Sequence, residues 1–187
     1  MNKGISGQYR NSAGRVLAFQ KHMGKVMSIN DIRNSYSWLI GMKYFEAPAS
    51  SKYHGAYEGG LYDHSELVAL TLVDMTKRLD LKWERPESPY LVGFFHDLCK
   101  VDAYRKTDDN GYKYNSDMLL PGHGEKSAIL ALQHIPLTDE EIMCIRYHMG
   151  AYEGEGIWKN LGNVIKKYPN VLWTHTADMV ASQIIGI

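Results

Sequence analysis

The sequence predicts an all-α fold with at most a minor β-hairpin. Apolar residues recur at helical spacing in several segments, and glycine and proline punctuate the chain between those segments. The length of 187 residues suits one well-buried domain, and no repeat, low-complexity tract or linker divides it. We therefore expect a single helical domain over residues 1–187.

The beginning of the chain is less regular than the rest. Residues 1–30 contain several glycines, and only the stretch RVLAFQKHMGKVMS could form a short helix or a strand pair. We treat residues 1–30 as an N-terminal extension whose structure the sequence leaves open.

A helix follows, because Asn30 is a suitable N-cap and Pro48 forces a stop before it. Gly59 and Gly60 then mark a loop.

The next two helices are expected to carry polar residues on apolar faces. The segment HSELVALTLVDMTKRLD predicts a helix with one inward face. That face is formed by His64, Leu67, Val68, Thr71, Leu72, Met75 and Leu79. Ser88 and Pro89 supply an N-cap followed by proline at the first helical position, so a second helix opens there. We expect it to run through His96 and Asp97 toward Val101.

The last third of the chain predicts one hairpin and three helices. Asn110-Gly111 is a turn signal for a small hairpin, and a helix begins near Gly124. The segment LTDEEIMCIRYHMG, residues 137–150, carries a capping box at its start and a glycine cap at its end. His148 would therefore lie in the last turn of that helix. A final helix follows Pro169, and its expected inward face holds Val171, Thr174, Asp178, Ala181 and Ile185.

Composition limits the cellular setting. Lysine plus arginine equals aspartate plus glutamate at 21 each, so no net charge draws the chain to nucleic acid or to a membrane surface. No apolar run approaches the length of a membrane span, and the start lacks the apolar segment of a secretory signal. Cys99 and Cys144 have no metal-finger or redox spacing and sit in apolar patterns, as buried free thiols do. We expect a cytoplasmic protein that does not contact a membrane.

Several ionisable residues are predicted to be buried together. A buried polar group without a partner costs roughly 1 to 3 kcal/mol, and a charged group costs more. The residues concerned are His64, His96, Asp97, His148 and Asp178. A shared divalent cation would satisfy them, because imidazole and carboxylate groups suit Mn, Fe, Co, Ni, Zn or Mg. A single histidine on an apolar face is more often a hydrogen-bonded core residue, which is how we interpret His22 and His134.

The spacing of these residues resembles the HD-domain superfamily of metal-dependent phosphohydrolases, whose signature is H…HD…D. The resemblance runs over residues 44–184, which would form the HD core of a helical bundle. It is closest to the HD domain of bacterial 3′→5′ exoribonucleases and their phage-like stand-alone relatives. Five segments carry it in the family's order: YFEAPASSKYHGAYEGGLYDHS, FFHDLCK, PGHGEKS, RYHMGAYEG and THTADMVAS.

The resemblance implies one metal site and favours a second. The signature ligands would be His64, His96, Asp97 and Asp178. In relatives with two metals, the residues that match His123 and His148 hold the second ion, and Asp97 bridges both. Two departures stand out, because the family usually has glycine where this chain has Cys99 and often a histidine where it has Tyr147. Neither departure removes a ligand.

Catalytic and substrate-binding residues follow from the same segments. Two divalent ions would activate water for hydrolysis of a P–O bond, with Asp97 at the centre. Lys100 could offer positive charge to a substrate phosphate or, equally, form a salt bridge that orients a ligand carboxylate. His54 and Lys126 are the preferred substrate-binding residues among the rim candidates. Those candidates are His54, Tyr57, Glu58, Lys126, Arg146 and Tyr152.

The sequence leaves three functions open. The first is a phosphohydrolase that acts on a nucleotide or another small phosphorylated substrate. The second is a phosphodiesterase or exonuclease for short oligonucleotides or cyclic dinucleotides, although residues 1–30 supply no nucleic-acid-binding module. The third is a non-catalytic sensor that keeps the metal for stability. From the resemblance we also expect that a homodimer can form.

Overall fold

The prediction of an all-α fold with a minor hairpin is confirmed. The structure, a computed structural model, describes residues 11–119, 122–152 and 154–187. Eight α-helices are found in this part of the chain: α1 (Ser12–Met23), α2 (Ile29–Gly41), α3 (Gly60–Leu79), α4 (Ser88–Phe95), α5 (Gly124–Leu132), α6 (Asp139–Arg146), α7 (Glu155–Lys167) and α8 (Asn170–Met179). The two strands are β1 (Tyr104–Lys106) and β2 (Tyr112–Tyr114), paired antiparallel across the turn at Asn110, whose φ is 63°. None of the described helices combines the length and the apolar character that crossing a membrane requires.

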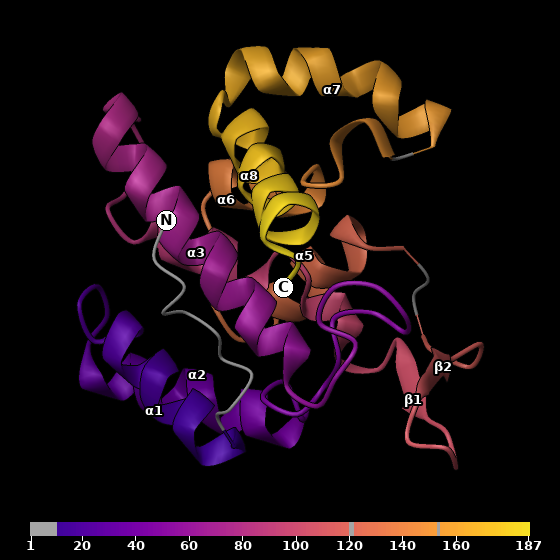
Figure 1. The fold of residues 1–187 in the computed structure, drawn as a ribbon. Helices are drawn as coiled ribbons and strands as arrows, with labels where there is room; N and C mark the ends of the chain where they lie inside the picture. The colour runs from indigo at the N-terminus through magenta and orange to yellow at the C-terminus, as the bar shows by residue number, and fades with distance from the viewer. Residues whose placement is uncertain (1–10, 120–121, 153) are drawn as a thin grey trace.

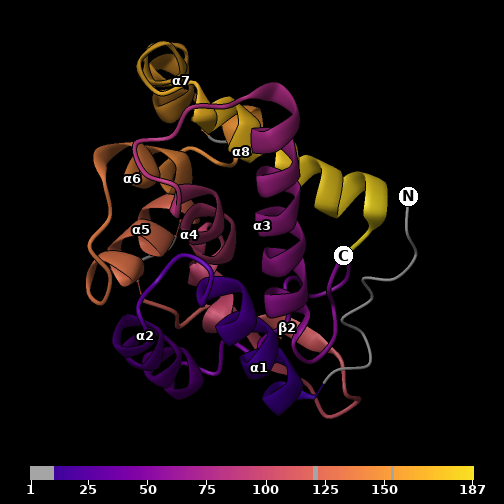
Figure 2. The ribbon, with the colours of Figure 1, turned by 90° about the vertical axis from the view of Figure 1, so that its left-hand side faces the viewer.

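Helix α3 is the central element of the fold. It passes through the middle of the molecule in both ribbon views, with α7 toward one end and α1 and α2 toward the other (Figures 1 and 2). Helix α4 packs closely along it at Gly93, where a Cβ atom would lie 2.3 Å from the Cα of Ala69. Any larger residue at Gly93 would push the two helices apart.

Helix α1 is part of the core, which answers a question that the sequence left open. Asn11 caps α1 by accepting a hydrogen bond from the Gly14 amide, and Phe19 on this helix is fully buried against Phe94. Arg15 is buried as well, and its guanidinium donates to both carboxylate oxygens of Asp63 at 3.0 and 2.9 Å. Residues 1–10 of the predicted extension lie outside the described residues.

Two apolar clusters fill the molecule on either side of α3. The first joins α1, α2, α4 and α5 around large aromatic side chains such as Phe19, Tyr44 and Phe95. The second joins α6, α7 and α8 around Cys144 and Val171. Both cysteines are buried and unpaired, as predicted. Burying this apolar surface is the main stabilising term, at about 25 cal/mol for each Å² removed from water.

Helix α4 ends earlier than predicted, and the difference matters for the site. The helix stops at Phe95 and is capped by His96, while Asp97 has φ −106° and ψ 20°, outside the helical range. A 3-10 turn then covers residues 98–101. Ser88 does not cap the helix, because it is the first helical residue and its hydroxyl donates to Glu141 at 2.7 Å.

Helices α2 and α6 also have limits that differ from the predictions, and two inward faces are shorter than predicted. Helix α2 begins at Ile29, so Asn30 lies inside it, and it ends at Gly41, well before Pro48. The capping box at Thr138 is confirmed, but α6 ends at Arg146, which leaves His148 in the turn beyond it. The predicted inward faces of α3 and of the last helix extend too far, since Leu79 and Ile185 are 51% and 44% exposed.

Candidate metal centre

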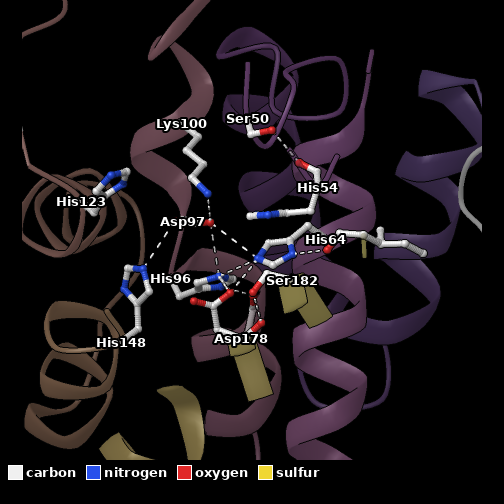
Figure 3. A network of polar contacts seen from close by, with 12 residues as sticks. Ser50, His54, His64, His96, Asp97, Lys100, His123, His148, Asp178 and Ser182 are labelled. Atoms are coloured by element: carbon white, nitrogen blue, oxygen red, sulfur yellow. Dashed lines mark hydrogen bonds and ion pairs between the residues drawn. The ribbon is translucent and has the colours of Figure 1, made fainter. Parts of the chain in front are cut away.

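The ends of five helices bring the predicted ligands together. Figure 3 shows the six predicted ligands, which include Asp97 and come from different places in the fold. They lie near the start of α3 (His64), at the end of α4 (His96), just after it (Asp97), before α5 (His123), after α6 (His148) and near the end of α8 (Asp178). Because α4 breaks between His96 and Asp97, these neighbours in sequence can both face the same centre.

The ligand atoms lie at short distances from one another. His64 Nε2 is 3.1 Å from Asp178 Oδ1 and 3.3 Å from His96 Nε2. Asp97 Oδ2 lies 3.6 Å from His64 Nε2 and 3.5 Å from His96 Nε2. His148 Nε2 lies on the other side of this carboxylate, 3.5 Å from Asp97 Oδ1. Two overlapping groups of three donors result: His64, His96 and Asp178, and then His96, Asp97 and His148.

Main-chain oxygens fix the orientation of the three buried histidines. Nδ1 of His64 lies 2.7 Å from the main-chain oxygen of Ile187, Nδ1 of His96 lies 2.9 Å from that of Gly93, and Nδ1 of His148 lies 2.8 Å from that of Ile145. An oxygen acceptor requires a proton on Nδ1, so a neutral ring must turn the lone pair of Nε2 toward the centre. This is the arrangement that metal-binding histidines use.

Charges at the centre keep the carboxylates ionised. Burial alone would raise the pKa of Asp97, but Lys100 Nζ at 2.6 Å and the nearby histidines hold that pKa well below its usual value. Burial would likewise raise the pKa of Asp178, but its contact with His64 holds it below the usual range. Burial lowers the pKa of His96 to about 4, so this imidazole is neutral near pH 7. The cavity therefore contains ionised carboxylates and the lone pairs of neutral imidazole.

His148 and Asp97 each have a buried atom that no hydrogen bond satisfies. Among the described residues, His148 Nε2 and Asp97 Oδ1 lack a hydrogen-bond partner although both side chains are inaccessible to solvent. Burial alone would lower the pKa of His148, but Asp97 raises it above the ordinary value, so a proton and a cation compete for the same nitrogen. Orphaned buried groups of this kind mark a missing ligand.

A cation fits the spacing of these atoms. A tetrahedral ion with ligand distances of about 2.0 Å leaves neighbouring nitrogen or oxygen ligands about 3.3 Å apart. The measured separations of 3.1 and 3.3 Å around His64 match this spacing. The donor set of imidazole nitrogens and carboxylate oxygens suits the borderline divalent metals.

His123 lies at the edge of the centre and is exposed, unlike the other five predicted ligands. Its Nδ1 is 3.5 Å from Cys99 Sγ, and donor atoms of Asp97, Cys99 and His123 form a third group within 4.8 Å of one another. The next residue, Gly124, packs against the end of α6, because a Cβ there would lie 2.0 Å from the Arg146 carbonyl oxygen. The apolar pattern around Cys99 predicts a buried thiol but does not indicate its contact with His123.

A pocket of about 360 Å³ opens over the centre. Asp97, His123 and Asp178 form its polar floor, and Lys100 and His54 line it as well. Small-molecule sites commonly measure about 300 to 1,000 Å³, so this pocket is at the lower end of that range. Its rim includes residues that the sequence did not single out: Tyr53, Tyr104, His175, Ser182 and Gln183.

The two predicted substrate-binding residues have different outcomes. His54 does line the pocket; its ring centroid is 4.9 Å from that of His64, and burial lowers its pKa to about 4. Its Nε2 has no hydrogen-bond partner among the described residues. The side chain of Lys126 is buried in an ion pair with Asp102 and is not among the residues that line the pocket, so the structure gives no support to a contact with substrate. Of the other rim candidates, Tyr152 alone is among the residues that line this pocket.

Comparisons of this chain with protein-family models, with curated proteins and with solved structures give no match. Membership of the HD-domain superfamily therefore stays a prediction that rests on the sequence motifs. The groups of His, Asp and Cys donors that could hold a metal ion rest instead on the structure itself.

Proposed function

We propose that this chain is a metal-dependent phosphohydrolase of the HD-domain type, acting on a nucleotide or another small phosphorylated molecule. Two divalent ions would be held, the first by His64, His96, Asp97 and Asp178. The second would share Asp97 and use His123 and His148. The supporting observation is the convergence of three Nε2 lone pairs and two carboxylates in one buried cavity, with each Nδ1 already held by a main-chain oxygen.

The chain's own residues prepare the reaction in distinct ways. Divalent ions bound at this centre supply Lewis acidity, which activates a water and withdraws charge from the phosphate oxygens. Asp97 holds negative charge between the two groups of histidines, and Lys100 neutralises one of its oxygens. Because Lys100 also lines the pocket, its ammonium group can contact a substrate phosphate. The neutral ring of His54 offers a hydrogen bond from the same wall.

The pocket favours a small substrate over a polymer. Among the lining residues that the structure describes, Lys100 is the single lysine or arginine, which suits one phosphate group better than a chain of them. Tyr53 and Tyr152 stand at the mouth and are 83% and 69% exposed. Aromatic rings in this position can stack on a nucleobase. These features support a nucleoside phosphate and weaken the case for an oligonucleotide or cyclic dinucleotide.

The test combines metal analysis with a substrate screen. Purified protein is analysed for metals and then assayed with Mn²⁺, Ni²⁺, Co²⁺, Zn²⁺ and Mg²⁺ against nucleotides, cyclic dinucleotides, a short RNA and bis-p-nitrophenyl phosphate. We expect metal-dependent release of phosphate from nucleotides, and no release by the His96→Ala variant. Consumption of RNA or a cyclic dinucleotide would mean that the substrate is a phosphodiester and not a phosphomonoester. Bound metal without turnover on any class would favour the non-catalytic sensor instead.

A further inference from the structure

A second feature of the centre concerns the cysteine beside His123. Cys99 Sγ lies 3.5 Å from His123 Nδ1, and the thiol is 3% exposed. The start of α5 contacts Cys99 at a second point, because the Ser127 hydroxyl accepts a hydrogen bond from the Cys99 amide at 3.0 Å. Ser127 follows His123 by one helical turn, so one helix end fixes both the main chain and the thiol of Cys99.

The distance between sulfur and nitrogen matches a shared ion. A tetrahedral metal with a sulfur ligand at about 2.3 Å and a nitrogen ligand at about 2.0 Å leaves the two ligand atoms about 3.5 Å apart. The measured separation is 3.5 Å. The donor atom of Asp97 completes a group of three within 4.8 Å.

Independent evidence for a ligand comes from the atoms opposite the thiol. Asp97 Oδ1 and His148 Nε2 are both buried without a hydrogen-bond partner among the described residues, and they lie 3.5 Å apart. In Figure 3 both His123 and His148 stand on the side of Asp97 away from His64. Asp97, whose Oδ1 is one of these orphaned atoms, belongs to the group of donors that contains Cys99 and His123, so the cysteine does not stand alone, and His148 belongs to the adjoining group that shares Asp97.

We propose that Cys99 is a thiolate ligand of the second ion, together with Asp97, His123 and His148. This inference rests on the proposed metal centre and adds one ligand to it. Sulfur, two nitrogens and an oxygen select Zn²⁺, Co²⁺ or Fe²⁺, whereas the first position, built from imidazole and carboxylate groups alone, accepts harder ions as well. Binding converts the thiol to a thiolate, and the released proton passes to solvent.

Cobalt titration tests the assignment without relying on activity. The whole chain is stripped with a chelator and titrated with Co²⁺, whose bond to a thiolate gives a near-ultraviolet charge-transfer absorption. The chain has two cysteines, so the absorption can come from Cys99 or Cys144 alone. Cys144→Ala is the matched control, because Cys144 is equally buried but packs in the second apolar cluster.

We expect wild type and Cys144→Ala to bind two Co²⁺ with the absorption, and Cys99→Ala to lose it. Cys99→Ala should also bind Zn²⁺ at the second position at least about 10-fold more weakly, and release one proton fewer, with Mg²⁺ binding unchanged. If Cys99→Ala fails to fold, retention of the absorption in Cys144→Ala still assigns it to Cys99.

Other outcomes separate the two proposals. Uptake of Co²⁺ by wild type without the absorption, or an absorption lost in Cys144→Ala, would overturn the cysteine ligand and leave the metal centre intact. Absence of Co²⁺ uptake by wild type, or uptake that His96→Ala leaves unchanged, would overturn the metal centre itself.

Discussion

Asp97 and Glu141 are two buried carboxylates with opposite surroundings. Glu141 accepts hydrogen bonds from Nε and Nη2 of Arg85, from the Ser88 hydroxyl and from the Thr138 amide, all between 2.7 and 2.9 Å. Asp97 Oδ2 pairs with Lys100, while its Oδ1 has no hydrogen-bond partner among the described residues and lies 3.5 Å from His148 Nε2. The side chain of Glu141 is 0% exposed and that of Asp97 is 2% exposed, so burial does not distinguish the two carboxylates.

The difference separates a carboxylate whose hydrogen bonds the protein satisfies from one that leaves an acceptor open to a ligand. Glu141 joins α6 to the start of α4 and has its hydrogen-bonding capacity used by the protein. Asp97 has a buried oxygen whose hydrogen-bonding capacity is unused, and burying such an oxygen costs free energy. This is expected where a ligand completes the site. Four experiments test this contrast.

The largest effect is expected from Asp97→Asn. Loss of this charge removes the ligand shared by both ions, and metal ions contribute several kcal/mol to catalysis, so turnover should fall at least about 10³-fold. Far-ultraviolet circular dichroism should remain helical. The measurement is kcat for the best nucleotide substrate at saturating metal. Activity within 10-fold of wild type would remove Asp97 from the centre.

Glu141→Gln should show the reverse pattern. It leaves Arg85 without its charged partner and weakens the hydrogen bonds to Ser88 and Thr138, at a cost of about 2 to 3 kcal/mol in the free energy of unfolding. Urea denaturation measures this loss, and kcat per folded molecule should match wild type. A stable variant with impaired kcat would mean that Glu141 serves the site and that the contrast with Asp97 is mistaken.

Metal should stabilise only the chain with an intact centre. At a concentration 100 times its Kd, an ion that binds only the folded state adds about 2.7 kcal/mol to stability. We expect Zn²⁺ or Mn²⁺ to raise the Tm of wild type and of Glu141→Gln by similar amounts, and to leave His96→Ala unchanged. Scanning calorimetry with and without a chelator measures the shift. An equal shift in His96→Ala would place the binding elsewhere.

The smallest effect is expected at the mouth of the pocket. Tyr152→Ala removes a ring that can stack on a base, so KM for a nucleotide should rise about 10-fold while kcat stays within a factor of about 3. Tyr114→Ala, on the hairpin and outside the pocket lining, is the matched control. A fall in kcat with KM unchanged would contradict a role limited to substrate binding.

Local sequence patterns predicted much of the site, and tertiary contacts decided the rest. His64 and Asp178 were found because helical spacing put them on inward faces, and both lie at the centre. Nearness to His123 in sequence says little about the direction in which Lys126 points. Three residues along a helix turn the side chain by about 300°, and here that turn leads to Asp102. The contact of Cys99 with His123 joins two segments across the fold, which no local pattern reveals.

Helix α7 was missed for a related reason. Its segment follows Gly154 without a side-chain cap, and exposed residues such as Trp158 alternate with half-buried ones such as Leu161 and Ile165. The sequence supplied no boundary signal of the kind that marked α6 with its capping box.

The close packing of α3 against α4 also bears on the ionic radius that the centre accepts. Gly93 touches Ala69, and its carbonyl oxygen orients His96, while Ala69 follows His64 by little more than one turn. The helices that carry the two Nε2 atoms, which are 3.3 Å apart, therefore approach each other through residues that are not predicted ligands. A methyl group added at Gly93 would widen that separation and favour ions of larger radius and higher coordination number. Helix packing at Gly93, three residues before His96, would thus influence which cations a metal centre here accepts.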